Sequence, residues 1–204
     1  QGVIHRDVKP LNVMVEQTAR DPNATLMDFG LVKALETSTA LTSQGTLLGS
    51  PEYMAPEQAD PNRKDEIGPA TDRYALGILA YRMLAGRVPF PGNTPGTLNA
   101  HMNLNVPDPR RFVQDLPPAV AEALLEMLAK APAERFSTAG AFVGRLREVQ
   151  EAEQQRRARE VQLAMLHTQL QAATARQDWP EVLQVGGQIQ ALQPDNAEAV
   201  RWIV

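Results

Sequence analysis

The stretch PATDRYALGILAYRMLAG, residues 69–86, carries apolar side chains around almost its whole circumference when it is drawn as a helix. A helix on the surface of a globular protein is apolar on one side only, so this pattern predicts a helix that other elements surround on every side. Gly86 and Pro89 are typical of a helix end. The chain must therefore fold into a body large enough to enclose a central helix.

The size and composition of the chain allow such a body. Its 204 residues suffice for one or two domains, and 43% hydrophobic against 22% charged residues is ordinary for a globular protein. The net charge of −4 gives no bulk electrostatic reason to bind nucleic acid. The sequence has no Cys, which excludes disulfides and thiolate metal sites and leaves the compartment open. No apolar run reaches the length of a membrane span, and the start has no signal-peptide pattern.

The beginning of the sequence predicts a β-hairpin. Val13–Val15 and Thr25–Met27 are short apolar runs, and the turn-forming residues EQTARDPNA lie between them. Residues 31–50 are polar, rich in Ser and Thr and without periodicity, which predicts a loop. Gln1 is not an initiator Met and a polar loop follows almost at once, so we expect this sequence to be part of a longer chain.

The second half of the sequence predicts helices. Two amphipathic helices follow the central one: the first opens at Pro117–Pro118, and Ser137 or Thr138 caps the second. Residues 150–160 are charge-rich and predict a charged helical linker or a solvated helix face. In residues 161–204, two further helical stretches are separated at RQDWPE and ended at LQPDNAEA.

The stretch VIHRDVKPLNVMVE, residues 3–16, sets His, Arg, Asp, Lys and Asn between apolar flanks, as a loop with chemistry would. Phosphoryl transfer needs a carboxylate for the attacking hydroxyl, a cation for the phosphate and oxygen ligands for Mg²⁺. Asp7 supplies the carboxylate, Lys9 the cation and Asn12 a neutral carbonyl oxygen. Asp28, after the second predicted strand, supplies a charged ligand. A hairpin would let all of them face one cleft.

HRDVKPLN, then DFG, then SPEYMAPE occur in this order, and together they resemble the signature set of protein kinases. The Lys9–Pro10 pair indicates the Ser/Thr class. MAPEQ and LAKAPAERFSTAGAFVGRLREV resemble the bacterial, eukaryotic-like kinases. Residues 1–149 would then form a kinase C-terminal lobe, mainly α with a small β-hairpin. The family's Gly-rich loop, strand Lys and αC Glu do not precede this loop here, so we expect a fragment without the small lobe that is inactive alone.

The resemblance implies roles for the residues that match the family's motifs. Asp7 would be the catalytic base and Lys9 the partner of the transferred phosphate. Asn12 and Asp28 would bind Mg²⁺, with Mn²⁺ as a second possibility. These two residues and Met14 would also contact ATP, because the strand that follows the loop lies below the adenine ring in the family.

Further roles concern regulation and substrate docking. The segment from Asp28 to Glu57 would be the activation and docking segment. Ser50 stands where the family usually has Thr and keeps the hydroxyl that contacts the catalytic Asp and Lys. Arg6 would bind a phosphate on the activation segment. The candidate acceptors of that phosphate are Thr42, Ser43 and Thr46.

The remaining implied roles are structural. His5 and Phe29 would stack in the hydrophobic spine of the active state. Asp72, in the central helix, would anchor the catalytic loop from below. Glu57 and Arg135 would form a buried ion pair that ties the docking segment to the lobe, although they are far apart in the sequence.

Residues 161–204 resemble a degenerate tetratricopeptide-type helical hairpin, with Trp179 at the turn into its second helix. Such a region could bind a protein partner. One repeat cannot bury its own face, so we expect more chain after Val204. A plain helical extension that packs on the lobe is the alternative, because Leu170, Val182 and Ile189 sit where the repeat usually has smaller residues.

The sequence thus predicts an enzyme that transfers the γ-phosphoryl group of ATP to Ser or Thr hydroxyls of proteins, with its kinase part in the cytoplasm. The sequence shows no membrane segment, and an anchor elsewhere stays open. A pseudokinase scaffold is the main alternative. A small-molecule kinase of the aminoglycoside-phosphotransferase type shares the His-x-Asp-x-x-x-x-Asn pattern but lacks the Lys9–Pro10 pair and the APE segment. A helical-repeat interaction protein would explain residues 150–204 only.

Overall fold

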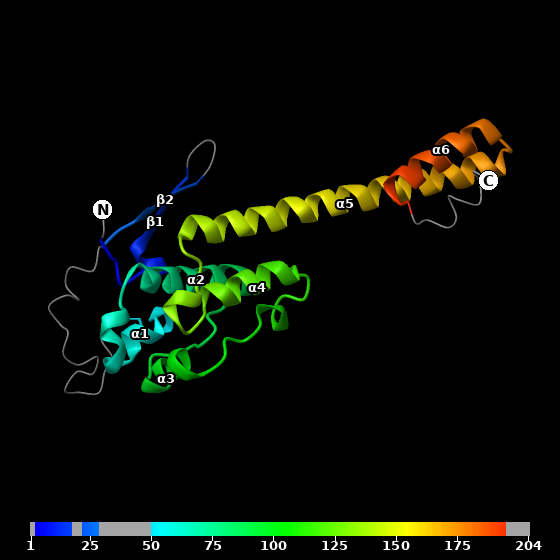
Figure 1. Ribbon diagram of the computed structural model, residues 1–204. Helices are drawn as coiled ribbons and strands as arrows, with labels where there is room; N and C mark the ends of the chain where they lie inside the picture. The colour runs from blue at the N-terminus through cyan, green and yellow to red at the C-terminus, as the bar shows by residue number, and fades with distance from the viewer. Residues whose placement is uncertain (1–2, 18–21, 29–49, 195–204) are drawn as a thin grey trace. The chain divides into compact units, whose positions relative to one another are not determined.

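A computed structural model of the chain is shown in Figure 1 and describes residues 3–17, 22–28 and 50–194. The chain divides into two compact units, residues 1–146 and residues 147–204. Helices dominate both units, and the described residues include one two-stranded antiparallel sheet, in the first unit. The predicted fold class, mainly α with a small β-hairpin, is confirmed.

The hairpin lies near the N-terminus (Figure 1). Strand β1 (Val13–Glu16) pairs antiparallel with β2 (Asn23–Leu26), and the first residue of β1 lies opposite the last residue of β2. Beyond this pair, the Met27 amide donates to the Asn12 carbonyl oxygen at 2.8 Å. The second strand begins earlier than the apolar run had indicated and ends one residue before it. The hairpin therefore brings the end of the polar loop beside the residues that lead to Asp28.

Helix α2 (Pro69–Ala85) is the central helix that the sequence predicts. None of the residues 70–81 is exposed, and the side chains of Tyr74, Ile78 and Tyr81 have no accessible surface. The last turn differs from the expectation, because it lies at the surface and 78% of Met83 is exposed. Gly86 ends the helix in the left-handed conformation, with φ of 71°.

The core of the first unit forms where α4 (Pro118–Met127) packs against α2, and the two helices run side by side in Figure 1. Gly77 makes this close approach possible. A Cβ at this position would lie 2.9 Å from side-chain atoms of both Met127 and Leu128, nearer than packed carbon atoms come. Helix α2 of this pair also contacts the N-terminal loop, through Asp72.

Short elements that begin with proline connect the longer helices. Proline is favoured in the first turn of a helix because its missing N–H has no intrahelical partner there. These elements are the helices α1 (Pro56–Ala59) and α3 (Pro95–Asn103) and the 3₁₀ turns Pro10–Asn12, Pro51–Tyr53, Pro61–Glu66, Pro109–Arg111 and Pro132–Glu134.

Helix α3 is absent from the sequence-based expectation because two of its four buried positions, Thr97 and His101, are polar. His101 is fully buried, its Nδ1 lies 2.9 Å from the Tyr74 hydroxyl, and its ring meets that of Phe90 edge-on. Lys130 donates to the His101 carbonyl oxygen at 2.7 Å. Burial lowers the pKa of His101 to about 4, and the charge of Lys130 acts in the same direction. His101 is therefore a neutral packing residue near neutral pH.

The second unit contains a helical hairpin. Helix α5 (Ala139–Ala175) begins after Thr138, whose Oγ1 accepts from the Ala141 amide at 3.0 Å, and it runs without a break through residues 150–160. After a short turn, α6 (Trp179–Leu192) follows. The contact between the two helices is apolar and consists of Leu166, Leu170, Ala173, Val182, Val185 and Ile189. The helical hairpin agrees with the sequence, whereas its likeness to a tetratricopeptide repeat stays a prediction.

Among the residues that the structure describes, no helix combines the length and the apolar character that a bilayer crossing requires.

Candidate active site

Asp72 on α2 fixes the backbone of residues 5–12, which we call the polar loop. Its Oδ2 accepts a hydrogen bond from the His5 amide at 2.8 Å, and its Oδ1 accepts one from the Arg6 amide at 2.7 Å. Arg6 has a φ of 65°, in the left-handed region that residues other than glycine rarely adopt. The carboxylate of a buried helix therefore holds the loop in an uncommon conformation immediately before Asp7.

His5 connects the same loop to the end of β2. Its Nδ1 accepts from the Asp7 amide at 3.3 Å, and its Nε2 lies 2.8 Å from the Met27 carbonyl oxygen. The ring nitrogen that accepts carries no proton, so Nε2 holds the proton and donates to Met27. The buried ring thus spans from the loop to the residue before Asp28. Phe29, its expected partner in the spine, lies outside the described residues.

Asp7, Lys9 and Asn12 form one polar cluster. The Lys9 ammonium lies 2.8 Å from Asp7 Oδ2, and both side chains are largely shielded from solvent. The Asn12 amide nitrogen donates to the Asp7 carbonyl oxygen at 2.8 Å and to Asp7 Oδ2 at 3.1 Å. The cation and the amide that phosphoryl transfer requires are therefore each within hydrogen-bond distance of the Asp7 carboxylate.

Asn12 and Asp28 offer the oxygen ligands that Mg²⁺ prefers. The amide nitrogen of the buried Asn12 is engaged by Asp7, so its carbonyl oxygen is the atom that remains for a cation. Asp28 is exposed and follows β2 with a φ of 56°. Among the described residues, no group of three or more His, Asp or Glu could hold a metal. The two residues suit a Mg²⁺ that takes its other ligands from water and phosphate.

Three large apolar side chains near the polar cluster in the sequence are exposed, in the Pro10–Asn12 turn and in β1. The exposed fraction is 83% for Leu11, 51% for Met14 and 61% for Val15. Exposed large apolar side chains are candidates for binding contacts. Met14, the expected neighbour of the adenine ring, is one of them.

A small pocket opens beside Asp7, between the polar loop and residues 50–59, which we call the SPEYMAPEQA segment. Ser50, the expected docking hydroxyl, is half-buried in it. The other lining residues come from both sides of the pocket and are Arg6, Asp7, Val8, Tyr53, Met54 and Gln58. The pocket therefore brings Ser50 and the carboxylate of Asp7 to one place.

Gln58 is a residue of this site that the sequence-based interpretation missed. Its Nε2 donates to the Arg6 carbonyl oxygen at 3.0 Å, and its Oε1 accepts from the Ala55 amide at 3.2 Å. The second bond has a sequence signal, since Gln at the third position of a helix often reaches back to the residue that precedes the helix. The bond to Arg6 crosses 52 positions and has no local signal.

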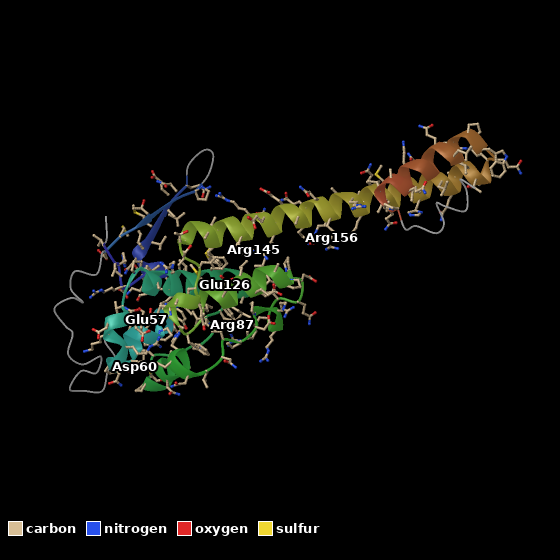
Figure 2. The ribbon with its side chains drawn as sticks, in the orientation of Figure 1. Glu57, Asp60, Arg87, Glu126, Arg145 and Arg156 are labelled. Carbon is tan, nitrogen blue, oxygen red and sulfur yellow. The ribbon has the colours of Figure 1, made fainter. Side chains whose placement is uncertain are left out.

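Glu57 lies on α1 (Figure 2) and forms with Arg135 the buried ion pair that anchors the SPEYMAPEQA segment. Two parallel bonds of 2.8 Å join their side chains, and both are 0% exposed. Thr71 donates to Glu57 at 2.9 Å, and Arg135 also donates to the Ala70 carbonyl oxygen at 2.8 Å. Burial alone would raise the pKa of Glu57, but the hydrogen bonds and charge of Arg135 hold it below its ordinary value.

The expected regulatory residues are only partly described. Arg6 is half-buried at the edge of the pocket. Thr42, Ser43 and Thr46 lie outside the described residues.

The chain is similar to known proteins over most of its length. The sequence model of the protein kinase domain matches residues 1–146. The serine/threonine-protein kinase pkn3 of Myxococcus xanthus is 37% identical over 155 residues, which cover 72% of this chain and 28% of that protein. The DNA damage-responsive serine/threonine-protein kinase RqkA of Deinococcus radiodurans is 42% identical over 146 residues, 71% of this chain and 21% of that protein.

A third relative is similar to a comparable part of the chain. The serine/threonine-protein kinase PknA of Mycobacterium tuberculosis is 36% identical over 141 residues, 69% of this chain and 31% of that protein. The chain thus spans less than a third of the length of each of these three relatives.

Proposed function

The chain belongs to the protein kinase domain family, and from this premise we propose that the full-length protein is a serine/threonine protein kinase. It transfers the γ-phosphoryl group of ATP to Ser or Thr hydroxyls of proteins. The observation that carries the proposal is the cluster in which Lys9 and Asn12 both lie within hydrogen-bond distance of the Asp7 carboxylate. The names of the bacterial relatives support the Ser/Thr class.

In this proposal, the loop residues act on the hydroxyl and on the phosphate. Asp7 orients the attacking hydroxyl and accepts its proton as the new O–P bond forms and the bond from the γ-phosphorus to the leaving ADP breaks. Lys9, 2.8 Å from that carboxylate, places a positive charge where negative charge collects on the transferred group. Because Asp72 holds the loop backbone, these groups need little rearrangement when the substrate binds.

Asn12 and Asp28 are the proposed ligands of Mg²⁺ or Mn²⁺, and the exposed side chain of Met14 is proposed to contact the adenine ring. When bound, the cation neutralises charge on the phosphate oxygens. The family uses ATP and Mg²⁺, and the donor set of one carboxylate and one amide oxygen suits that cation. The proposal places this part of the protein in the cytoplasm, where ATP is available.

The exposed carboxylate of Asp28 is proposed to be the charged ligand, so its loss should remove the metal dependence of nucleotide binding. In the full-length protein, Asp28→Ala should bind ATP weakly and with the same affinity whether Mg²⁺ is present or absent. Calorimetric titration with and without Mg²⁺ measures this, and Asp65→Ala, a change at an exposed carboxylate in the Pro61–Glu66 turn, is the matched control. An Asp28→Ala protein that keeps its Mg²⁺-dependent affinity would exclude this ligand assignment.

Regulation by phosphorylation remains part of the proposal. Arg6 is proposed to pair with a phosphate on Thr42, Ser43 or Thr46, because a planar guanidinium forms charge-assisted bonds with phosphate oxygens. Mass spectrometry of the active full-length protein should find phosphate in this segment, and Thr42→Ala should slow activation. Thr168→Ala, at an exposed position of α5, should leave activation unchanged. A fully active protein without phosphate between Thr37 and Thr46 would contradict the assignment.

The helical hairpin of the second unit is the proposed contact for a protein partner. Its exposed large apolar side chains are Val161, Met165, Trp179 and Leu183. Their exposure supports a binding surface, since apolar side chains at partner contacts are usually accessible before binding. If deletion of residues 161–204 left the binding of every physiological partner unchanged, this part of the proposal would be wrong.

A further inference from the structure

Arg6 is one of two described residues of the candidate active site with a strained backbone, and Asp28 is the other. With φ of 65°, Arg6 adopts a conformation that a residue with a side chain keeps only where its surroundings enforce it. Asp7 follows directly, so the orientation of the Arg6 peptide determines where the Asp7 side chain begins. Whatever enforces the conformation of Arg6 therefore controls the position of the proposed catalytic carboxylate.

Two side chains from different parts of the chain hold this residue. Asp72 on α2 accepts from the Arg6 amide at 2.7 Å. Gln58, in the SPEYMAPEQA segment, donates from Nε2 to the Arg6 carbonyl oxygen at 3.0 Å. One bond fixes the peptide before Arg6 and the other fixes the peptide after it. The second peptide also contains the Asp7 amide, which donates to His5 Nδ1 at 3.3 Å, so Gln58 holds its carbonyl oxygen while His5 holds its N–H.

The orientation of the Gln58 amide group is itself fixed. Its Oε1 accepts from the Ala55 amide at 3.2 Å while its Nε2 donates to Arg6. A reversed amide would set its carbonyl oxygen against that of Arg6 and its NH₂ against the N–H of Ala55. Both contacts would be repulsive. The two hydrogen bonds therefore require one orientation of the Gln58 amide group.

The other end of this connection is anchored in the core. Glu57, the neighbour of Gln58 on α1, is bound by Arg135 and has no exposed surface. Gln58 lines the pocket in which Ser50 and Asp7 meet. The Gln58 side chain thus links the SPEYMAPEQA segment to the loop that carries Asp7.

We propose that Gln58 is a positioning residue, which holds the Arg6 peptide in its left-handed conformation and thereby sets Asp7 against the substrate hydroxyl. This inference rests on the proposed function. Gln58 has no role in binding the nucleotide, so its loss should lower kcat and leave the KM for ATP unchanged. A misplacement of reacting groups of about 1 Å can lower a rate on the order of 10²-fold.

The test uses two variants of the full-length protein. Gln58→Met has a similar length and neither hydrogen bond, and its kcat should fall by roughly 10- to 100-fold with little change in the KM for ATP. Gln114→Met, at an exposed Gln, is the matched control. A Gln58→Met protein with the kcat of the wild type would overturn the proposal. The proposal would also be overturned if the loss of kcat were fully explained by an equal loss of folded protein.

In the Gln58→Glu variant, kcat should depend on pH in a way that a purely structural role of Gln58 would not produce. Its carboxylate keeps an acceptor for the Ala55 amide but repels the Arg6 carbonyl oxygen, whereas its protonated form can donate to that oxygen. Carboxyl groups bind protons as the pH falls toward about 4.3. The kcat of the variant, divided by that of the wild type, should therefore rise between pH 8 and pH 5.5. A ratio that stays constant over this range would overturn the proposal.

Hydrogen exchange separates this inference from the proposed function. In Gln58→Met, amides of residues 3–12 should exchange faster than in the wild type, whereas Gln114→Met should match the wild type. This measurement needs no catalysis, so an inactive wild type would refute the proposed function and still leave the exchange result decisive for Gln58. Identical exchange in the Gln58→Met variant and the wild type would overturn the inference.

Discussion

Asp7→Asn in the full-length protein should lower the rate of phosphoryl transfer about 10²- to 10⁴-fold, the usual contribution of a general base. The amide that replaces the carboxylate cannot accept the proton of the hydroxyl. The fold should persist, because Asp72 and Gln58 hold the backbone of the loop through peptide groups that the substitution leaves in place. Steady-state kinetics and the melting temperature, measured on the same preparation, test both halves of this expectation.

Asp65→Asn is the control for this experiment, because Asp65 is an exposed carboxylate on the Pro61–Glu66 turn. It should change neither the rate nor the melting temperature. If Asp7→Asn kept near-normal turnover, the assignment of Asp7 as the base would be wrong.

Glu57→Ala should destabilise the first unit by about 3–5 kcal/mol, because it leaves Arg135 charged and unpaired in the core. Chemical denaturation of the chain measures this change. Glu66→Ala breaks an ion pair with Arg63 at the surface, where solvent screens the charges, and should leave the stability almost unchanged. Equal midpoints for Glu57→Ala and the wild type would contradict the role of the buried pair.

The pH dependence of this effect has a definite sign. The pKa of Glu57 is lower in the folded protein than its ordinary value, so the pair contributes fully above the ordinary pKa of about 4.3. As the pH falls through the lowered pKa, the carboxylate binds a proton and this contribution is lost. The difference in stability between the wild type and Glu57→Ala should therefore shrink in acid and stay constant near neutral pH.

The sequence predicted those helices whose start, end or burial is encoded by residues close together in the chain. The apolar circumference of residues 69–86 predicted the central helix α2, and Gly86 predicted its end. The Thr138 cap predicted the start of α5. The charges of residues 150–160 left open whether a linker or a helix face lies there. In the structure they pair along one helix, since Arg156 lies 2.6 Å from Glu160 and 2.7 Å from Glu153.

The features that the sequence did not predict depend on contacts between distant residues. Helix α3 buries His101 against Tyr74, a partner 27 positions away, so its sequence lacks an apolar stripe. The bond from Gln58 to Arg6 exists only because α1 lies against the loop. The contact of Glu57 with Arg135 could be expected from the resemblance to kinases but not from any spacing in the chain.

The central claim is that the cluster around Asp7 transfers phosphate from ATP to protein hydroxyls. The most direct test incubates the purified full-length protein with γ-labelled ATP, Mg²⁺ and a generic protein substrate, and then identifies the labelled amino acids. We expect label on Ser or Thr, dependent on Mg²⁺ and almost absent with Asp7→Asn. A folded wild-type protein that binds Mg²⁺ and ATP but transfers no label would contradict the claim and indicate a pseudokinase scaffold.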